Sequence, residues 1–176
     1  MGRVLCWLYH FIAYYITWFV CIGYAAAGDQ WLGPAIAGGL VVSQVVVQIV
    51  CVKPWRRELL FALVLMLIGI LVDSIFLRTG LIYFKSNPFA DMVSPPWMAC
   101  LWLSFGFTMP ITSSAWLHRY VVLGVLTFFS LPFAYWVGAV VGAATINTNW
   151  FYPALGGIWM ILLPLLLHYL FIRNKR

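Results

Sequence analysis

Six long apolar runs constrain this chain more than any other feature of its sequence. A helix of roughly 20 apolar residues crosses the hydrocarbon core of a bilayer, which is about 30 Å thick. The runs cover residues 4–26, 31–52, 59–77, 96–117, 120–144 and 151–172. Of the 176 residues, 65% are hydrophobic and 8% are charged, whereas about 25% are charged in an average soluble domain. The sequence therefore predicts an all-α polytopic transmembrane bundle of six helices, with residues 1–176 as a single integral membrane domain.

The first run also has features of a secretory signal peptide, because Arg3 precedes it and Ala25, Ala26 and Ala27 stand at its end. Signal peptides have an apolar core of about 7–15 residues. This run is longer and contains several aromatic residues and a histidine. We therefore interpret it as a retained helix.

Basic residues predict which side of the membrane each loop faces, because cytoplasmic loops are enriched in Lys and Arg. If the N-terminus is cytoplasmic, only Arg78 and Lys85 lie on the opposite side. The cytoplasmic set is then Arg3, Lys53, Arg56, Arg57, Arg119, Arg173, Lys175 and Arg176. We expect both termini to be cytoplasmic.

The net charge of +6 is explained by the same loops, and we expect no nucleic-acid partner. One cytoplasmic loop combines Lys53, Trp55, Arg56 and Arg57. Cations near an anionic membrane surface contribute about 1 kcal/mol each to binding. The sequence therefore predicts contacts with anionic lipid headgroups at the cytoplasmic face, and it leaves open a membrane-protein partner.

Asp73 is the most informative single residue, because it interrupts the otherwise apolar third run. At 1.5 Å per residue it lies roughly 20 Å from the cytoplasmic end of that run. A carboxylate at such a depth costs at least about 2.5 kcal/mol unless it faces protein or water. It is therefore either a proton or cation site, or a structural group hydrogen-bonded between helices. A direct ion pair with Arg78 is not expected, since the two residues lie about 140° apart around a regular helix.

The same count of helical rise indicates which polar residues share the depth of Asp73. They are Thr17, Trp102, Ser104 and Tyr135, with Trp18 beside Thr17. Indole N–H groups and hydroxyls are suitable donors to a carboxylate. We predict a ligand or proton site formed by Asp73 and these residues.

A second polar layer is predicted closer to the cytoplasmic side. Gln44 and Gln48 share one helical face, and His10 lies at a similar depth. Such residues commonly link transmembrane helices through hydrogen bonds, which we favour over a role for His10 as a proton carrier.

No cluster in the sequence predicts a metal site or a cofactor. The three histidines are far apart in the sequence, and the four cysteines have no CxxC spacing. The sequence also lacks a recognisable nucleophile, so it does not favour an enzyme.

Two further features of the sequence, a long connection and an internal proline, predict local structure. The long connection from Arg78 to Pro95 contains an apolar patch, so it lies in the plane of the membrane interface, folds back over the bundle, or is a plain linker anchored by Tyr83 and Phe84. We favour the plain linker. Pro110 is expected to break the fourth helix, because an internal proline removes a backbone hydrogen bond.

Three stretches together resemble a family of small proteobacterial inner-membrane proteins that is catalogued as a domain of unknown function. They are GILVD at 69–73 followed by GLIYF at 80–84, PPWMACLWLSF at 95–105, and LPFAYWVGA at 131–139. The resemblance covers nearly the whole chain and implies a bacterial inner-membrane location. It also implies a link to membrane-lipid modification, since relatives are often encoded beside enzymes of the cyclopropane-synthase type. One departure is that Ile111 and Thr112 replace an Asn-His pair of the family pattern.

Three functions remain as hypotheses. The first is an accessory or binding protein linked to membrane-lipid metabolism or envelope maintenance, which agrees with the short loops and the basic cytoplasmic face. The second is a small proton- or cation-coupled transporter that uses Asp73. The third is an integral-membrane enzyme that modifies lipids.

Overall fold

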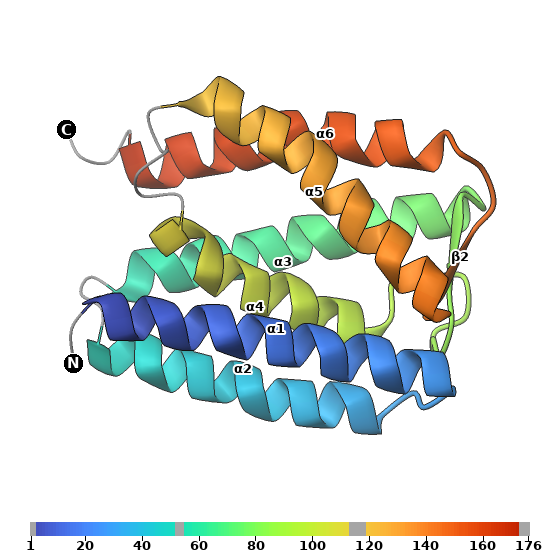
Figure 1. Cartoon of the computed structure of the whole chain (residues 1–176), viewed down its shortest axis with the longest axis horizontal. Coiled ribbons are helices and arrows are strands. Elements are labelled where there is room, and N and C mark those ends of the chain that lie inside the picture. Colours follow the sequence, from blue (N-terminus) through green and yellow to red (C-terminus); the bar gives the residue numbers. More distant parts are fainter. Residues whose placement is uncertain (1–2, 52–54, 113–118, 173–176) are drawn as a thin grey trace.

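The computed structural model describes residues 3–51, 55–112 and 119–172 as a bundle of six helices (Figure 1). The helices are α1 (Arg3–Ala27), α2 (Leu32–Cys51), α3 (Trp55–Arg78), α4 (Pro96–Thr112), α5 (Tyr120–Val141) and α6 (Phe151–Leu167). A π-helical turn, His168–Ile172, continues α6. The predicted fold class, a polytopic helical bundle, is confirmed. That residues 1–176 form a single domain stays a prediction.

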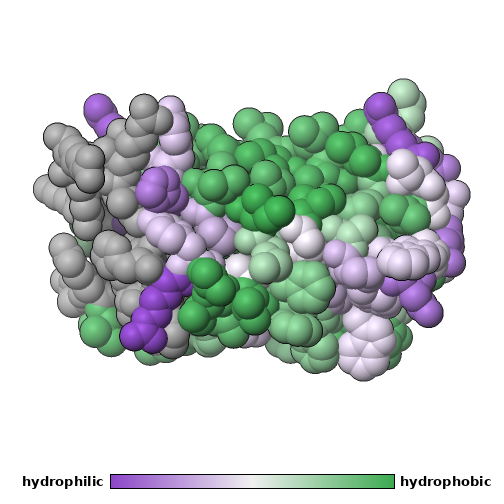
Figure 2. All heavy atoms as spheres, turned by 90° about the horizontal axis from the view of Figure 1, so that it is seen from above, coloured by the Kyte–Doolittle hydropathy of each residue, from purple (hydrophilic) through white to green (hydrophobic). Residues whose placement is uncertain are grey.

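Five of the helices are long and apolar enough to cross a membrane, and the described part of α4 has 17 residues. Large apolar side chains are exposed along the outer faces of the bundle, among them Val46, Leu67 and Phe129. Figure 2 shows a broad hydrophobic belt between more hydrophilic ends. Exposed apolar surface of this extent is suited to lipid rather than to water. The chain is therefore a multi-pass membrane protein, while the cytoplasmic position of its termini stays a prediction.

The helices form two units. In the first, α4 packs against α1, α2 and α3, and no residue from 96 to 110 is exposed. In the second, α5 and α6 form an antiparallel pair that lies across the first unit (Figure 1). Aromatic side chains join the units: Phe76 of α3 packs against Phe151 of α6, and Trp102 of α4 stacks on Trp159 of α6. The junction between the units is therefore where residues from four different helices can meet.

The two ends of the bundle differ. At one end, here called the basic end, α1, α3 and α5 begin, next to Arg56, Arg57 and Arg119. At the other, here called the loop end, strands β1 (Ile82–Phe84) and β2 (Ala144–Ile146) form a two-stranded antiparallel sheet. The register pairs Tyr83 with Thr145.

This sheet corrects two expectations from the sequence. The fifth helix ends at Val141 and not at residue 144, because Gly142 adopts a left-handed conformation (φ 92°) that caps the helix and frees the following residues to pair with β1. The connection 78–95 is not a plain linker, since Ile82 and Phe84 are buried. Lys85 and Ser86 bind it to α1 by donating hydrogen bonds to the carbonyls of Ala26 and Ala25.

Two other boundaries also differ from the prediction. The third helix begins at Trp55 and not at residue 59, so Trp55, Arg56 and Arg57 lie in its first turn and not in a loop. The fourth helix continues through Pro110 to Thr112, so the expected break at Pro110 is wrong. A transmembrane helix tolerates an internal proline when neighbouring groups satisfy the freed carbonyl.

A buried carboxylate beside an apolar cleft

Asp73 lies at the junction between the two helical units and is completely buried. Its Oδ2 accepts a hydrogen bond from the indole Nε1 of Trp102 at 2.7 Å, and its Oδ1 accepts one from the hydroxyl of Tyr135 at 2.5 Å. The three residues, which we call the carboxylate cluster, come from α3, α4 and α5. Each carboxylate oxygen therefore has a neutral donor, and the Tyr135 bond ties the α5–α6 unit to the rest of the bundle.

Gly69 makes this arrangement possible, and sequence reasoning missed it. A Cβ atom at Gly69 would lie 2.4 Å from the Trp102 ring, closer than any real side chain is found. Gly69 lies one turn before Asp73 on the same helical face, and the indole covers both residues. On its other side Trp102 stacks on Trp159, with ring centroids 4.5 Å apart. The signal that could have revealed this role is the spacing of four between a small residue and the buried acid.

The structure brings only part of the predicted site together. Trp102 and Tyr135 contact Asp73, whereas Thr17 and Ser104 are buried with hydroxyls that make no hydrogen bond among the described residues. Arg78, as expected, does not pair with Asp73; its Nε donates to the carbonyl of Met92 at 2.8 Å. Depth along a helix follows from the sequence, but the direction of each side chain depends on how neighbouring helices are rotated. The functional role of the cluster stays a prediction.

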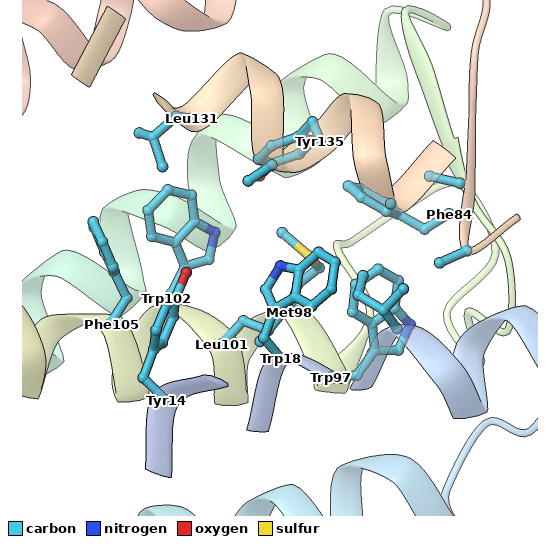
Figure 3. Close-up of a pocket in the computed structure, with 15 residues that line it drawn as sticks. Tyr14, Trp18, Phe84, Trp97, Met98, Leu101, Trp102, Phe105, Leu131 and Tyr135 are labelled. Atoms are coloured by element: carbon cyan, nitrogen blue, oxygen red, sulfur yellow. The ribbon is translucent and has the colours of Figure 1, made fainter. Parts of the chain in front are cut away.

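An apolar cleft lies directly beside the carboxylate cluster, between α1 and α5 (Figure 3). Tyr14 and Trp18 of α1 line one side, and Leu131 and Tyr135 of α5 line the other. Its remaining lining residues are Ile22, Phe84, Trp97, Met98, Leu101, Trp102, Phe105, Ala134, Gly138, Ala143 and Ala144. The cavity volume is about 60 Å³. Trp102 and Tyr135 thus belong to both features and separate the carboxylate from the cleft.

The lining shows where the cleft opens. Trp97, Leu101 and Trp102 are almost completely buried and form its inner wall. Trp18 and Ala134 are only half-buried, and they lie on two helices that are long and apolar enough to span the membrane. The mouth therefore faces the side of the bundle, between α1 and α5, where lipid would surround the protein.

The second predicted layer, here called the histidine layer, consists of His10, Gln44 and Gln48, all completely or almost completely buried. The Gln44 side-chain amide donates to the backbone carbonyl of His10 at 3.3 Å, and that of Gln48 donates to Glu58 at the start of α3. Both ring nitrogens of His10 and both amide oxygens make no hydrogen bond among the described residues. The His10 ring stacks on Phe107 at 6.0 Å. This layer lies within the first helical unit.

Three of the predicted headgroup residues, Trp55, Arg56 and Arg57, lie at the basic end. Arg56 is exposed, and its guanidinium lies 5.5 Å from the ring centroid of Trp55. Lys53 falls outside the described residues. Where the structure describes the chain, no three His, Cys, Asp or Glu side chains gather in a way that would hold a metal ion. The expectation that the protein uses no metal or cofactor stays a prediction.

A comparison with known families agrees with the resemblance found in the sequence. A family model described as a protein of unknown function (DUF2878) matches residues 7–165. The chain belongs to the DUF2878 family. The matched span contains the carboxylate cluster, all residues that line the cleft and the histidine layer. No curated protein and no solved structure matches the chain. Ile111 and Thr112, where the chain departs from the family pattern, have side chains outside the described part of the structure.

Proposed function

We propose that this protein binds a membrane lipid, by the end of one acyl chain, in the cleft between α1 and α5, and that it serves lipid metabolism in a bacterial inner membrane as a binding or accessory protein. The observation that carries the proposal is the sideways-facing apolar cleft, whose inner wall is fixed by the carboxylate cluster. Ligand sites are usually concave and mostly apolar, with a few fixed polar groups, and this cleft has that composition.

An acyl chain suits the cleft for two reasons. Cavities lined by apolar side chains stay dry and take up apolar guests, and this lining is almost entirely aromatic and aliphatic. The mouth also lies between two long apolar helices, so a chain can enter from the hydrocarbon without crossing water. The tail of a membrane lipid is the ligand that is present at that depth.

Asp73 has a positioning role in this proposal. Trp102 and Tyr135 both line the cleft and donate to the carboxylate. With Asp73 in place, the indole and the phenol ring are held at fixed orientations, so their apolar faces form a stable wall. The carboxylate itself does not line the cleft and does not need to contact the ligand.

The proposal can be tested by photo-crosslinking in vesicles with a phospholipid that carries a diazirine on one acyl chain. We expect crosslinked peptides from α1, α4 and α5 around the cleft. Ala134→Phe places a ring in the cleft and should remove those crosslinks. Val140→Phe adds the same ring to the exposed face of α5, where Val140 is 67% exposed, and should leave them unchanged. Equal crosslinking of the cleft in both variants would overturn the proposal.

Proton- or cation-coupled transport is a second candidate, and one observation favours it. Among the described residues the buried carboxylate is held by two neutral donors and not by a cation, so it can gain or lose a proton without breaking a contact with a charged partner. This hypothesis predicts ligand binding that depends on pH in the native protein and no longer does so in Asp73→Asn. Unchanged pH dependence in that variant would exclude Asp73 as the coupling group. Carbodiimide labelling of Asp73 that rises at low pH and is blocked by a solute would favour transport over a purely structural carboxylate.

A further inference from the structure

A second groove runs along the outer face of α3, on a part of the molecule that the proposed function does not use. It is lined by Leu67, Ile70, Leu71, Ser74, Ile75, Arg78, Met92 and Val93 and has a volume of about 350 Å³. That volume is at the lower end of the range of about 300–1,000 Å³ for small-molecule sites. The groove is therefore large enough for part of a lipid molecule.

The connection 78–95 builds one wall of this groove at the loop end. Two hydrogen bonds fix it to α3: the Nε of Arg78 donates to the carbonyl of Met92 at 2.8 Å, and the backbone N–H of Ser94 donates to the Ser74 hydroxyl at 3.0 Å. Met92 and Val93, which are both exposed, are thereby held beside the helix. The wall is thus fixed to the helix by polar contacts at two points, one at the carbonyl of Met92 and one directly after Val93.

Charge and apolar surface are separated along the groove. Leu67, Leu71 and Ile75 are 61%, 59% and 51% exposed and present aliphatic surface toward the position of the membrane. Arg78 is exposed at the loop end, and because its bond to Met92 uses Nε, its two terminal nitrogens are left to face an anion. A guanidinium presents several donors in a planar fork that matches phosphate geometry.

The length of the groove matches one leaflet. From Leu67 to Arg78 the helix rises about 16 Å, which is about half of a hydrocarbon core of roughly 30 Å. A phospholipid with its phosphate at Arg78 would therefore lay its acyl chain along Ile75, Leu71 and Leu67. A free phosphate ion would contact only the cationic end and would leave the apolar part of the groove unused.

We propose that this groove binds an anionic phospholipid of the leaflet at the loop end, with its phosphate on the guanidinium of Arg78 and one acyl chain along α3. This site is separate from the cleft between α1 and α5, and it shares no lining residue with it. It would recognise the lipid by its negative charge.

The test uses the full chain in phosphatidylcholine vesicles that contain a small fraction of a photoactivatable lipid, either phosphatidylglycerol or phosphatidylcholine with the same diazirine chain. Crosslinks are mapped to peptides by mass spectrometry. We expect phosphatidylglycerol to label residues 67–75 and 92–93 about fivefold more than phosphatidylcholine, the ratio that one cation near a membrane surface supplies. Arg78→Gln should remove this excess, while Arg78→Lys should keep part of it.

Lys85→Gln is the matched control, because Lys85 is a cation at the same end that donates to the carbonyl of Ala26 and does not line the groove. The Lys85→Gln protein should keep the excess of phosphatidylglycerol labelling over phosphatidylcholine labelling. Equal labelling of the groove by both lipids in the native protein would overturn the proposal, as would an excess that persists in Arg78→Gln. If Arg78→Gln does not fold, the native comparison and Arg78→Lys still decide the question. The cleft proposal is unaffected by either result, since its crosslinks map to α1, α4 and α5.

Discussion

The carboxylate cluster and the histidine layer are both buried groups of polar residues, yet they are built in opposite ways. In the carboxylate cluster both oxygens of Asp73 accept a hydrogen bond. In the histidine layer both ring nitrogens of His10 and the side-chain oxygens of Gln44 and Gln48 have no such partner among the described residues. The cluster also joins α5 to the first helical unit, whereas the histidine layer lies within that unit.

This difference teaches which buried polar group the fold depends on. A buried donor or acceptor that loses its partner costs about 1–3 kcal/mol, whereas removing a group that has no partner leaves no new donor or acceptor unsatisfied. The carboxylate cluster should therefore be sensitive to substitution, and the histidine layer tolerant. Four substitutions test that contrast, from the largest expected effect to the smallest.

Asp73→Leu should have the largest effect. It leaves the indole N–H of Trp102 and the hydroxyl of Tyr135 buried without an acceptor, at about 1–3 kcal/mol for each. Asp73→Asn should cost much less, because the amide oxygen accepts from Trp102 and the amide nitrogen donates to the Tyr135 oxygen. Thermal unfolding in mild detergent, followed by circular dichroism, measures both. An Asp73→Leu protein as stable as the native one would contradict the importance of the cluster.

Gly69→Ala should come next, with a loss of about 1–3 kcal/mol that is typical of overpacking. The new methyl group would overlap the Trp102 ring, so the indole must leave its position above Asp73. Gly157→Ala is the control, since a Cβ there meets nothing within 4 Å. Circular dichroism melting curves of the two variants should differ clearly. If they coincide, Trp102 is not held as tightly as the hydrogen bond and the stacking indicate.

Tyr135→Phe should have a smaller effect, about 1 kcal/mol, since it removes one hydrogen bond and keeps the ring. Combining it with Asp73→Leu, which removes the acceptor of the Tyr135 hydroxyl, tests whether the two residues interact energetically. The double variant should then lose less stability than the sum of the two single variants, measured by denaturant unfolding in detergent. Strict additivity would mean that the bond between them contributes nothing.

His10→Phe should have the smallest effect and should be close to neutral. The new ring keeps the stacking on Phe107 and removes two nitrogen atoms that have no hydrogen-bond partner among the described residues. Denaturant unfolding in detergent measures the effect of this substitution as well. A loss larger than that of Asp73→Leu would reverse the comparison and would show that His10 binds a partner, such as an internal water molecule or a proton, that the protein needs.

The sequence was sufficient for the helical bundle and for part of the carboxylate cluster. Apolar runs of membrane-spanning length specify the helices, and the helical rise places Trp102 and Tyr135 at the depth of Asp73. The helical rise does not specify rotation, so it also predicts Thr17 and Ser104 for the same site, although neither hydroxyl makes a hydrogen bond among the described residues. The left-handed turn at Gly142 and the pairing of β1 with β2 depend on contacts between distant segments, which no local pattern encodes.

The cleft was also out of reach of the sequence. It forms because α5 packs mainly against α6 and makes few contacts with α1, so that Ala134 and Gly138 line a space between the two helices. Small residues at intervals of four usually indicate close packing of helices. Here Ala134 and Gly138 line a cavity, while Gly142 lies beyond the end of the helix.

Native mass spectrometry of the protein released from its own membrane in a mild detergent tests the central claim, that the cleft binds a lipid. The account predicts that the native protein and Val140→Phe each retain a lipid that Ala134→Phe loses. Retention of the same lipids by all three proteins would contradict it. A native protein that carries a stoichiometric protein partner and no lipid would contradict it as well.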